Sequence, residues 1–80
     1  MITQVSDLWA VCWSTSGGEP IVECVFAVAL VDGEIQAFVT GRELSPITEV
    51  SNFFGLFRGG ELDVAREAAR KEGVLRAKSL

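Results

Sequence analysis

The side chains of this chain that could do chemistry are two cysteines, Cys12 and Cys24, and a scatter of carboxylates. The chain has no histidine and no tyrosine, so it lacks the commonest general base and the commonest metal ligand. Two cysteines without C-x-x-C spacing are too few for a zinc site, and a serine or cysteine nucleophile has no histidine to activate it. The sequence therefore predicts a protein that is not an enzyme and that holds no metal and no cofactor.

The two cysteines are spaced so that they could lie side by side on neighbouring strands. As cross-strand neighbours they could form a disulfide if the chain were exported or if they acted as a redox switch. In a cytoplasmic protein a free cysteine behaves as a small hydrophobic residue. We therefore expect Cys12 and Cys24 to be two buried free thiols.

The carboxylates form no ligand motif, and their distribution along the chain is uneven. Residues 1–57 carry seven acidic side chains and one basic side chain, whereas residues 58–80 carry six basic and four acidic ones. A carboxylate pair that works as acid and base needs a cleft, and a small sheet offers little cleft. An acidic body disfavours direct contact with duplex nucleic acid and suits a basic protein partner. Solubility alone is the simpler explanation of the same charge.

A predicted hairpin around Asp32-Gly33 positions many of these side chains. Asp-Gly between two apolar runs favours a type I′ turn, which needs positive φ at both central residues. The two runs are residues 21–31 and 34–40, and residues 8–14 form a further run rich in aromatic and β-branched residues, which is typical of strands. The sequence therefore predicts a three-stranded antiparallel meander.

A two-residue turn fixes the register of its hairpin, and the register assigns each side chain to a face. The turn pairs Leu30 with Ile35, Val28 with Ala37 and Phe26 with Val39. A three-residue loop at 17–19 would pair Cys12 with Cys24 in the first hairpin. One purely apolar face results, which we expect to be a core covered by the C-terminal helix: Leu8, Ala10, Cys12, Val22, Cys24, Phe26, Val28, Leu30, Ile35, Ala37 and Val39.

The opposite face of the predicted sheet is mixed but carries Trp9, Val11, Trp13, Val25 and Phe38. An uncovered apolar patch larger than a few hundred Å² is unusual on a monomer and marks an interaction surface. Tryptophan is a common anchor of such surfaces. Three covers remain open for this face: the segment 46–57 with its phenylalanines, a second copy of the chain, or a protein partner.

A helix is predicted over 61–72, with acidic residues in its first turn, basic residues in its last turn, and Gly73 just past its end. The segment before it is ambiguous. Ser45-Pro46 can begin a helix, but the aromatic and β-branched residues that follow are poor helix formers. We expect a short helix near 46–53 or an ordered loop at about 46–57. The predicted fold class is α+β, a three-stranded or four-stranded antiparallel sheet packed against a C-terminal helix.

Eighty residues make one domain, 1–80. The longest uninterrupted apolar run, residues 25–31, is far shorter than the roughly 20 residues that span a bilayer. The first residues lack the basic stretch of a signal peptide. We therefore expect a cytoplasmic protein that does not contact membranes.

The sequence predicts a small acidic protein that acts by stoichiometric binding. The expected partner is a basic or nucleic-acid-binding protein, which is the physical type of interaction made by phage-encoded inhibitors of bacterial defence complexes. The alternative is a structural homodimer that uses the face of Trp9, Trp13 and Phe38. The residues expected to contact a partner are Trp9, Trp13, Glu23, Val25, Glu34, Phe38, Glu43 and Glu49.

Overall fold

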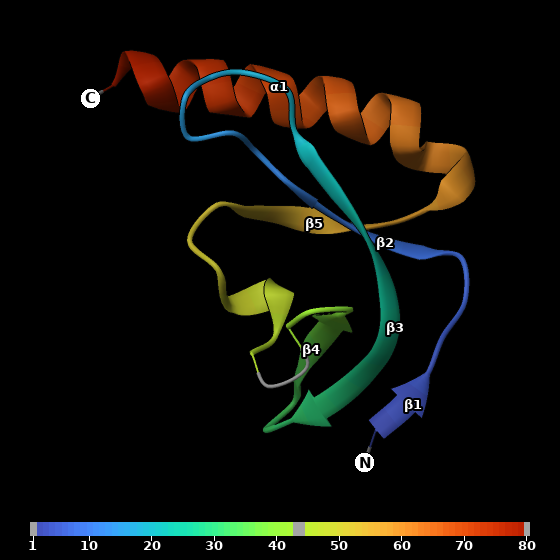
Figure 1. The fold of residues 1–80 in the computed structure, drawn as a ribbon. Helices are drawn as coiled ribbons and strands as arrows, with labels where there is room; N and C mark the ends of the chain where they lie inside the picture. Colours follow the sequence, from blue (N-terminus) through green and yellow to red (C-terminus); the bar gives the residue numbers. More distant parts are fainter. Residues whose placement is uncertain (1, 43–44, 80) are drawn as a thin grey trace.

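The computed structural model describes residues 2–42 and 45–79 of the chain. Within these ranges the chain forms an antiparallel sheet and one α-helix at the C-terminal end (Figure 1). The elements in order are β1 (Ile2–Gln4), β2 (Leu8–Cys12), β3 (Ile21–Val31), β4 (Glu34–Val39), the 3₁₀ turn η1 (Ile47–Glu49), β5 (Phe53–Arg58), the 3₁₀ turn η2 (Gly59–Glu61) and α1 (Leu62–Lys78). The α+β class is confirmed, and the described sheet has five strands rather than three or four.

The long strand β3 organises the sheet. It pairs antiparallel with β2 and β4, which confirms the predicted meander. The first strand β1 pairs with β3 as well, at residues 27–29, while β2 pairs with its residues 21–24. The last strand β5 pairs with β2. Figure 1 shows β3 strongly curved, with α1 at one end of the molecule and the β3–β4 turn at the other.

The predicted Asp32-Gly33 turn is present. Asp32 has a φ of 51° and Gly33 a φ of 80°, which is the conformation that a type I′ turn requires. Leu30 lies opposite Ile35, as the two-residue turn predicts. The local chemistry of the turn is sufficient to set the register of the residues next to it.

Further along this hairpin a β-bulge changes the pairing. Val39 lies opposite Val25 rather than opposite Phe26 as predicted, because Phe26 is an extra residue on β3. The bulge places Val25 on the same side as Val39, and both are fully buried. Phe26 is instead 40% exposed. The predictions that Phe26 is in the core and that Val25 lies on the opposite face are therefore wrong.

The register predicted for the first hairpin is also wrong. Cys24 lies opposite Trp9 and not opposite Cys12, a shift of an odd number of residues that exchanges the two faces. The connection between β2 and β3 spans residues 13–20 instead of the predicted three-residue loop, and distant parts of the chain bind to it. The backbone N–H of Trp13 donates to the carbonyl of Asn52 at 3.0 Å, and Arg70 of α1 binds Glu19 in the same connection.

Two apolar clusters lie on opposite sides of the sheet. The first contains buried residues of β2, β3, β4 and η1: Ala10, Cys12, Val25, Ala37, Val39 and Ile47. The second joins β2 to the helix through Val11, Ala65 and Ala69, with Trp13 and Phe57 packed against them. The helix therefore covers the side of β2 that carries Val11 and Trp13, and the prediction that it covers the side of Ala10 and Cys12 is wrong.

The C-terminal helix runs past the predicted end. Gly73, expected just after the helix, is buried inside α1, which continues to Lys78. A Cβ atom at Gly73 would lie 2.9 Å from the carbonyl oxygen of Ser14, so this glycine permits close packing rather than ending the helix. In the described ranges, no helix combines the length and apolar character needed to cross a membrane.

The ambiguous segment before the helix divides into two elements. Ile47–Glu49 is a 3₁₀ turn of three residues, which lies within the helix predicted near 46–53 but is much shorter, and the ordered loop considered up to 57 is wrong because β5 begins at Phe53. Residues 53–58 form the strand β5, whose side chains contribute to both clusters: Phe53 and Leu56 to the first, Phe54 and Phe57 to the second. The segment 46–57, one of the three covers considered for the tryptophan face, therefore contributes a strand to the sheet itself.

Candidate protein-binding surface

Exposed apolar side chains gather at the end of the molecule farthest from α1. Leu30 is 64% exposed and Ile35 is 58% exposed, and the two lie opposite each other beside the β3–β4 turn. Ile2 of β1 and Val31 of β3 are exposed at the same end of the sheet but on its other face, because Ile2 lies opposite Ala29 and Val31 lies opposite Glu34, out of alternation with Leu30 and Ile35. We call Ile2, Leu30, Val31 and Ile35, together with the turn acids Asp32 and Glu34, the tip surface.

The exposure of Leu30 and Ile35 corrects the prediction that they lie in the core. They share a face with Val28 and Ala37, which belong to or pack against the first cluster. Ile47 of η1 is part of that cluster, but Leu30 and Ile35 lie beyond it at the end of the hairpin. A shallow hollow of about 420 Å³ remains, lined by Thr3, Val28, Ala29, Leu30 and Ile35.

The tip surface is acidic as well as apolar. Asp32 and Glu34 occupy the turn and its first following residue, and both are exposed. Neither makes a salt bridge with any residue in the part of the chain that the structure describes. By contrast, Glu19, Glu67 and Glu72 of the connection and helix are each paired with an arginine. Two carboxylates without a salt bridge among the described residues therefore lie at the same end of the hairpin as the exposed apolar pair.

The other predicted acidic contacts are dispersed. Glu49 accepts a hydrogen bond from Nε2 of Gln36 at 3.0 Å, on the outer side of β4. Glu23 is half-buried opposite Ala10, away from the turn. Glu43 lies outside the described residues. Among the predicted acids, Glu34 is the one that the structure brings to the tip surface.

The predicted aromatic contacts do not form one exposed surface. Trp13 is half-buried in the cluster beneath the helix, and the guanidinium of Arg76 lies over its ring at 5.1 Å. Trp9 is half-buried and its indole N–H donates to Oδ1 of Asp7 at 3.4 Å. Phe38 is half-buried on β4 opposite Ala27, and Val25 is inaccessible. The chain's own helix therefore covers Trp13, one of the two tryptophans whose cover the sequence left open.

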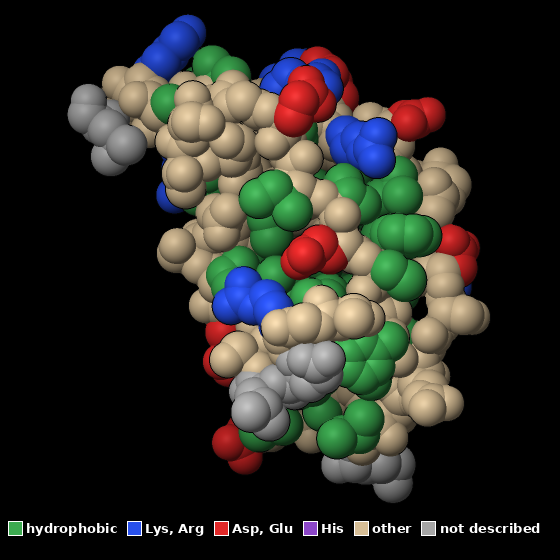
Figure 2. All heavy atoms as spheres, in the orientation of Figure 1, with side chains coloured by type: hydrophobic (Ala, Val, Ile, Leu, Met, Phe, Trp, Pro, Cys, Tyr) green, Lys and Arg blue, Asp and Glu red, His purple; other side chains and the backbone are tan. Residues whose placement is uncertain are grey.

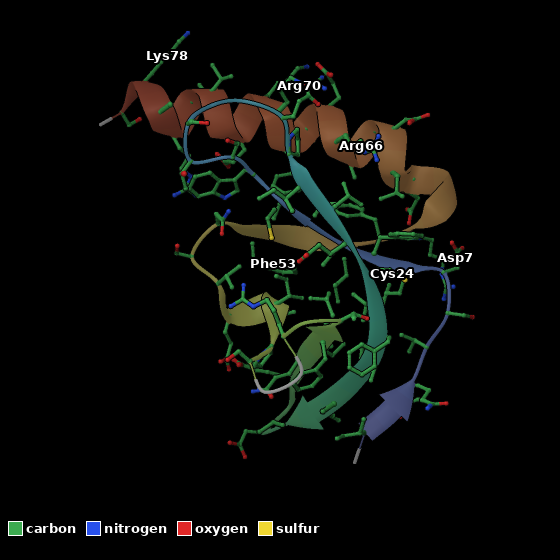
Figure 3. The ribbon with its side chains drawn as sticks, viewed as in Figure 1. Asp7, Cys24, Phe53, Arg66, Arg70 and Lys78 are labelled. Atoms are coloured by element: carbon green, nitrogen blue, oxygen red, sulfur yellow. The ribbon has the colours of Figure 1, made fainter. Side chains whose placement is uncertain are left out.

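The two cysteines lie on opposite faces of the sheet. Cys12 is buried and Cys24 is exposed, so the expectation of two buried thiols holds for Cys12 alone. Burial, and then the negative charge of Glu23, raise the pKa of the Cys12 thiol. A thiol with a raised pKa is a poor nucleophile, so Cys12 acts as a core residue. Figure 3 shows Cys24 on β3, on the side of the molecule toward Asp7.

Sequence reasoning missed the apolar half of the tip surface because Leu30 and Ile35 continue the alternation of the core residues. Their position beside the turn is the signal that could have identified them, since the end of a hairpin extends past the elements that cover its middle. Figure 2 shows exposed hydrophobic side chains below the helix, and several charged side chains over α1.

Comparison with known proteins finds no matching family model, no matching curated protein and no matching solved structure.

Proposed function

We propose that this chain is a non-enzymatic, cytoplasmic binding protein whose tip surface docks on a basic protein. The observation that carries the proposal is the exposed pair of Leu30 and Ile35 near the carboxylates of Asp32 and Glu34, which make no salt bridge with any described residue. Single exposed apolar residues are normal on protein surfaces, but Leu30 and Ile35 form an exposed pair that borders a hollow, and grouped apolar residues are characteristic of interaction sites. The apolar pair would supply contact area, and the carboxylates would select the partner.

The charges favour a different protein over a second copy at this surface. Two copies joined by their tips would bring Asp32 and Glu34 of one molecule close to the same residues of the other, and like charges at an interface cost affinity. A partner with lysine or arginine around an apolar patch would gain both contacts. Nucleic-acid-handling proteins carry such basic surfaces, so a stoichiometric inhibitor of a protein of this kind is the function that we propose.

The alternative homodimer through the tryptophan face receives less support. Trp13 is half-buried beneath α1 and Arg76 lies over its ring. Val11, between the tryptophans, is completely buried. A dimer built on this face would need the helix to move, which would expose the second apolar cluster.

The proposal can be tested by affinity capture from the native host with matched variants. The wild-type chain should retain a basic protein, and the double variant Leu30→Thr/Ile35→Thr should weaken its capture roughly tenfold or more while keeping strand-forming residues. Glu34→Lys should also weaken capture and reduce its sensitivity to salt. Ile21→Thr, a change at an exposed residue at the other end of β3, is the control. Capture that survives the double variant, or that is insensitive to salt, would contradict the proposal.

A further inference from the structure

The strand β1 lies at one margin of the sheet, at the end of the molecule away from α1 (Figure 1). It pairs with β3 along one edge, and in the described part of the chain no strand pairs with its other edge. The backbone N–H of Val5 donates to the carbonyl of Phe26 on β3 at 3.2 Å. Backbone groups of alternate residues point to the same edge of a strand, so those of Thr3 point toward β3 as well. Those of Ile2 and Gln4 therefore point away from the sheet.

The other two margins of the sheet carry features that hinder the pairing of a further strand. Beside β4, the hydroxyl of Thr48 in η1 accepts a hydrogen bond from the N–H of Ala37 at 3.3 Å. On β5, Phe54 is the extra residue of a bulge, and the N–H of Arg58 donates to the carboxylate of Glu61 at 3.0 Å. Bulges and covering segments keep strand edges from pairing. The register of β1 with β3 is regular, so β1 offers the plainest edge.

A strand added to this edge would also reach the hollow of the tip surface. The hollow, of about 420 Å³, is lined by Thr3, Val28, Ala29, Leu30 and Ile35. In an antiparallel arrangement, Ile2 and Gln4 would make the new backbone hydrogen bonds. Thr3 would then form a non-hydrogen-bonded pair, in which the facing side chains come closest. The side chain opposite Thr3 would therefore lie beside the hollow, and an apolar one would fill it.

The acids of the tip surface give the added strand a charge and a direction. Ile2 pairs nearer to the β3–β4 turn than Gln4 does, so an antiparallel strand beside β1 runs toward the turn. Asp32 and Glu34 are exposed there, and neither makes a salt bridge with a described residue. Four residues of extended chain span about 13 Å, which takes the added strand from Thr3 to the level of the turn. A lysine or arginine at that place would meet the two acids.

We propose that the outer edge of β1 binds an extended segment of the basic partner protein as an additional antiparallel strand. The segment carries an apolar residue opposite Thr3 and a lysine or arginine about four residues later. Its backbone bonds to Ile2 and Gln4 supply affinity, and its two side chains supply selectivity, as in other cases of strand addition. The inference rests on the proposed function, because it names the part of the partner that the tip surface binds.

A second copy of the chain fits this edge less well than a basic segment. Two β1 strands paired about Thr3 would place threonine opposite threonine and leave the hollow without an apolar side chain. The residue four places after Thr3 is Asp7, so a second copy would bring an acid rather than a base toward Asp32 and Glu34. Like charges at an interface cost affinity.

A defined peptide tests the strand addition. It has nine residues and blocked ends, with leucine in the fourth place, lysine in the eighth and ninth, and threonine elsewhere. Titrated into the isotope-labelled chain, it should bind with a dissociation constant of about 0.1–1 mM and shift the amide signals of Ile2 and Gln4 and the methyl signals of Leu30. The peptide of reversed sequence should bind roughly tenfold more weakly. No saturable binding up to about 5 mM, or equal binding of the reversed peptide, would overturn the proposal.

Methylation of single peptide nitrogens separates edge pairing from simple apolar contact. The third and fifth residues of the peptide donate their N–H groups to Gln4 and Ile2, whereas the N–H of the leucine points away from β1. Methylation at the third or fifth nitrogen should therefore weaken binding roughly tenfold, and methylation at the leucine nitrogen should change it less than about threefold. Equal losses at all three nitrogens would contradict the strand addition.

Two further measurements distinguish this inference from the proposed function. If the methylated peptides show no alternation while Leu30→Thr/Ile35→Thr still weakens capture of a basic protein, the strand addition is wrong and the proposed function stands. If that double variant leaves capture unchanged, the proposed function fails and the inference fails with it. Sedimentation of the chain without peptide should show a monomer. A dimer whose Ile2 and Gln4 amides are protected from hydrogen exchange would show that a second copy occupies the edge, which would overturn the inference.

Discussion

Gly73 of α1 lies against the backbone of Ser14, in the connection between β2 and β3. A Cβ atom at this glycine would be 2.9 Å from the carbonyl oxygen of Ser14 and 3.3 Å from its nitrogen. Real Cβ atoms essentially never approach backbone so closely, so a side chain here would force the helix and the connection apart. The same connection is tied to α1 by Arg70, which donates to both carboxylate oxygens of Glu19 at 3.0 Å.

The close approach predicts an unusual effect for Gly73→Ala. Replacing glycine by alanine inside an exposed helix raises stability by about 1 kcal/mol. Here we expect the free energy of unfolding to fall by about 1–3 kcal/mol, because the new methyl group overlaps backbone that cannot move freely. Urea denaturation measures the change. Gly60→Ala is the control, since a Cβ at Gly60 would meet nothing within 4 Å, and a stabilised Gly73→Ala protein would contradict the packing.

Truncation of two apolar residues of β3 should separate core from surface. Val25→Ala removes contacts from a fully buried side chain and should lower the free energy of unfolding by about 2 kcal/mol. Leu30→Ala removes a larger side chain at an exposed position and should change it by less than about 0.5 kcal/mol. Chemical denaturation of the two variants checks the order, and equal losses would mean that the tip surface is covered.

The two thiols should react at very different rates. Cys24 is exposed and Cys12 is buried with a raised pKa, so a thiol reagent should add once to the native protein and twice after denaturation. Mass spectrometry counts the additions, and Cys24→Ser should abolish the native one. Double labelling of the native protein would show that the first apolar cluster opens readily.

The ion pair between Glu19 and Arg70 predicts a dependence of stability on pH. The hydrogen bonds and charge of Arg70 lower the pKa of the Glu19 carboxyl. A carboxyl with a lowered pKa stabilises the folded state above its unfolded pKa, about 4.3 for glutamate, and this contribution is lost as the pH falls through the lowered folded value. The melting temperature of Glu19→Gln should therefore be below that of wild type above about pH 5, and the two should converge toward pH 3.

Salt and a second variant provide the controls for this ion pair. Both side chains are exposed, so high salt should reduce the difference in melting temperature between Glu19→Gln and wild type. Glu34→Gln removes an exposed carboxylate that has no salt bridge among the described residues, and should not reproduce the effect. A difference that persists unchanged at pH 3 would point to lost packing of the connection rather than to charge.

Features set by neighbouring residues could be predicted from the sequence, and features set by distant ones could not. The turn at Asp32-Gly33 depends on two residues, and both the turn and the adjacent pair of Leu30 and Ile35 are as predicted. The register of the first hairpin depends on Asn52 and Arg70, which are far away in the sequence. Nothing in the alternation of β3 indicated which residue would be the extra one.

The strand β5 and the tip surface illustrate two further limits. Phe54 and Phe57 have the spacing of one helix face. They share a side of β5 because the register with β2 shifts at Phe54, and the alternation of the sequence does not reveal that shift. The acidic half of the tip surface is visible in the charge of the chain. Its apolar half is not, because the exposure of Leu30 and Ile35 depends on how far η1 extends over the sheet, which is a property of the assembled fold.

The bulge at Phe26 separates the end of the β3–β4 hairpin from the rest of β3. Because Phe26 is an extra residue on β3, the alternation of side chains between the two faces shifts there by one residue. The part of β3 before Phe26 follows the register with β2, on which α1 packs, and the part after it follows the register set by the turn. We therefore expect that residues beyond the bulge can be replaced by those of another hairpin without changing which side chains face α1. A single inserted residue thus changes the phase of β3 between the part that pairs with β2 and the part that leads to the turn.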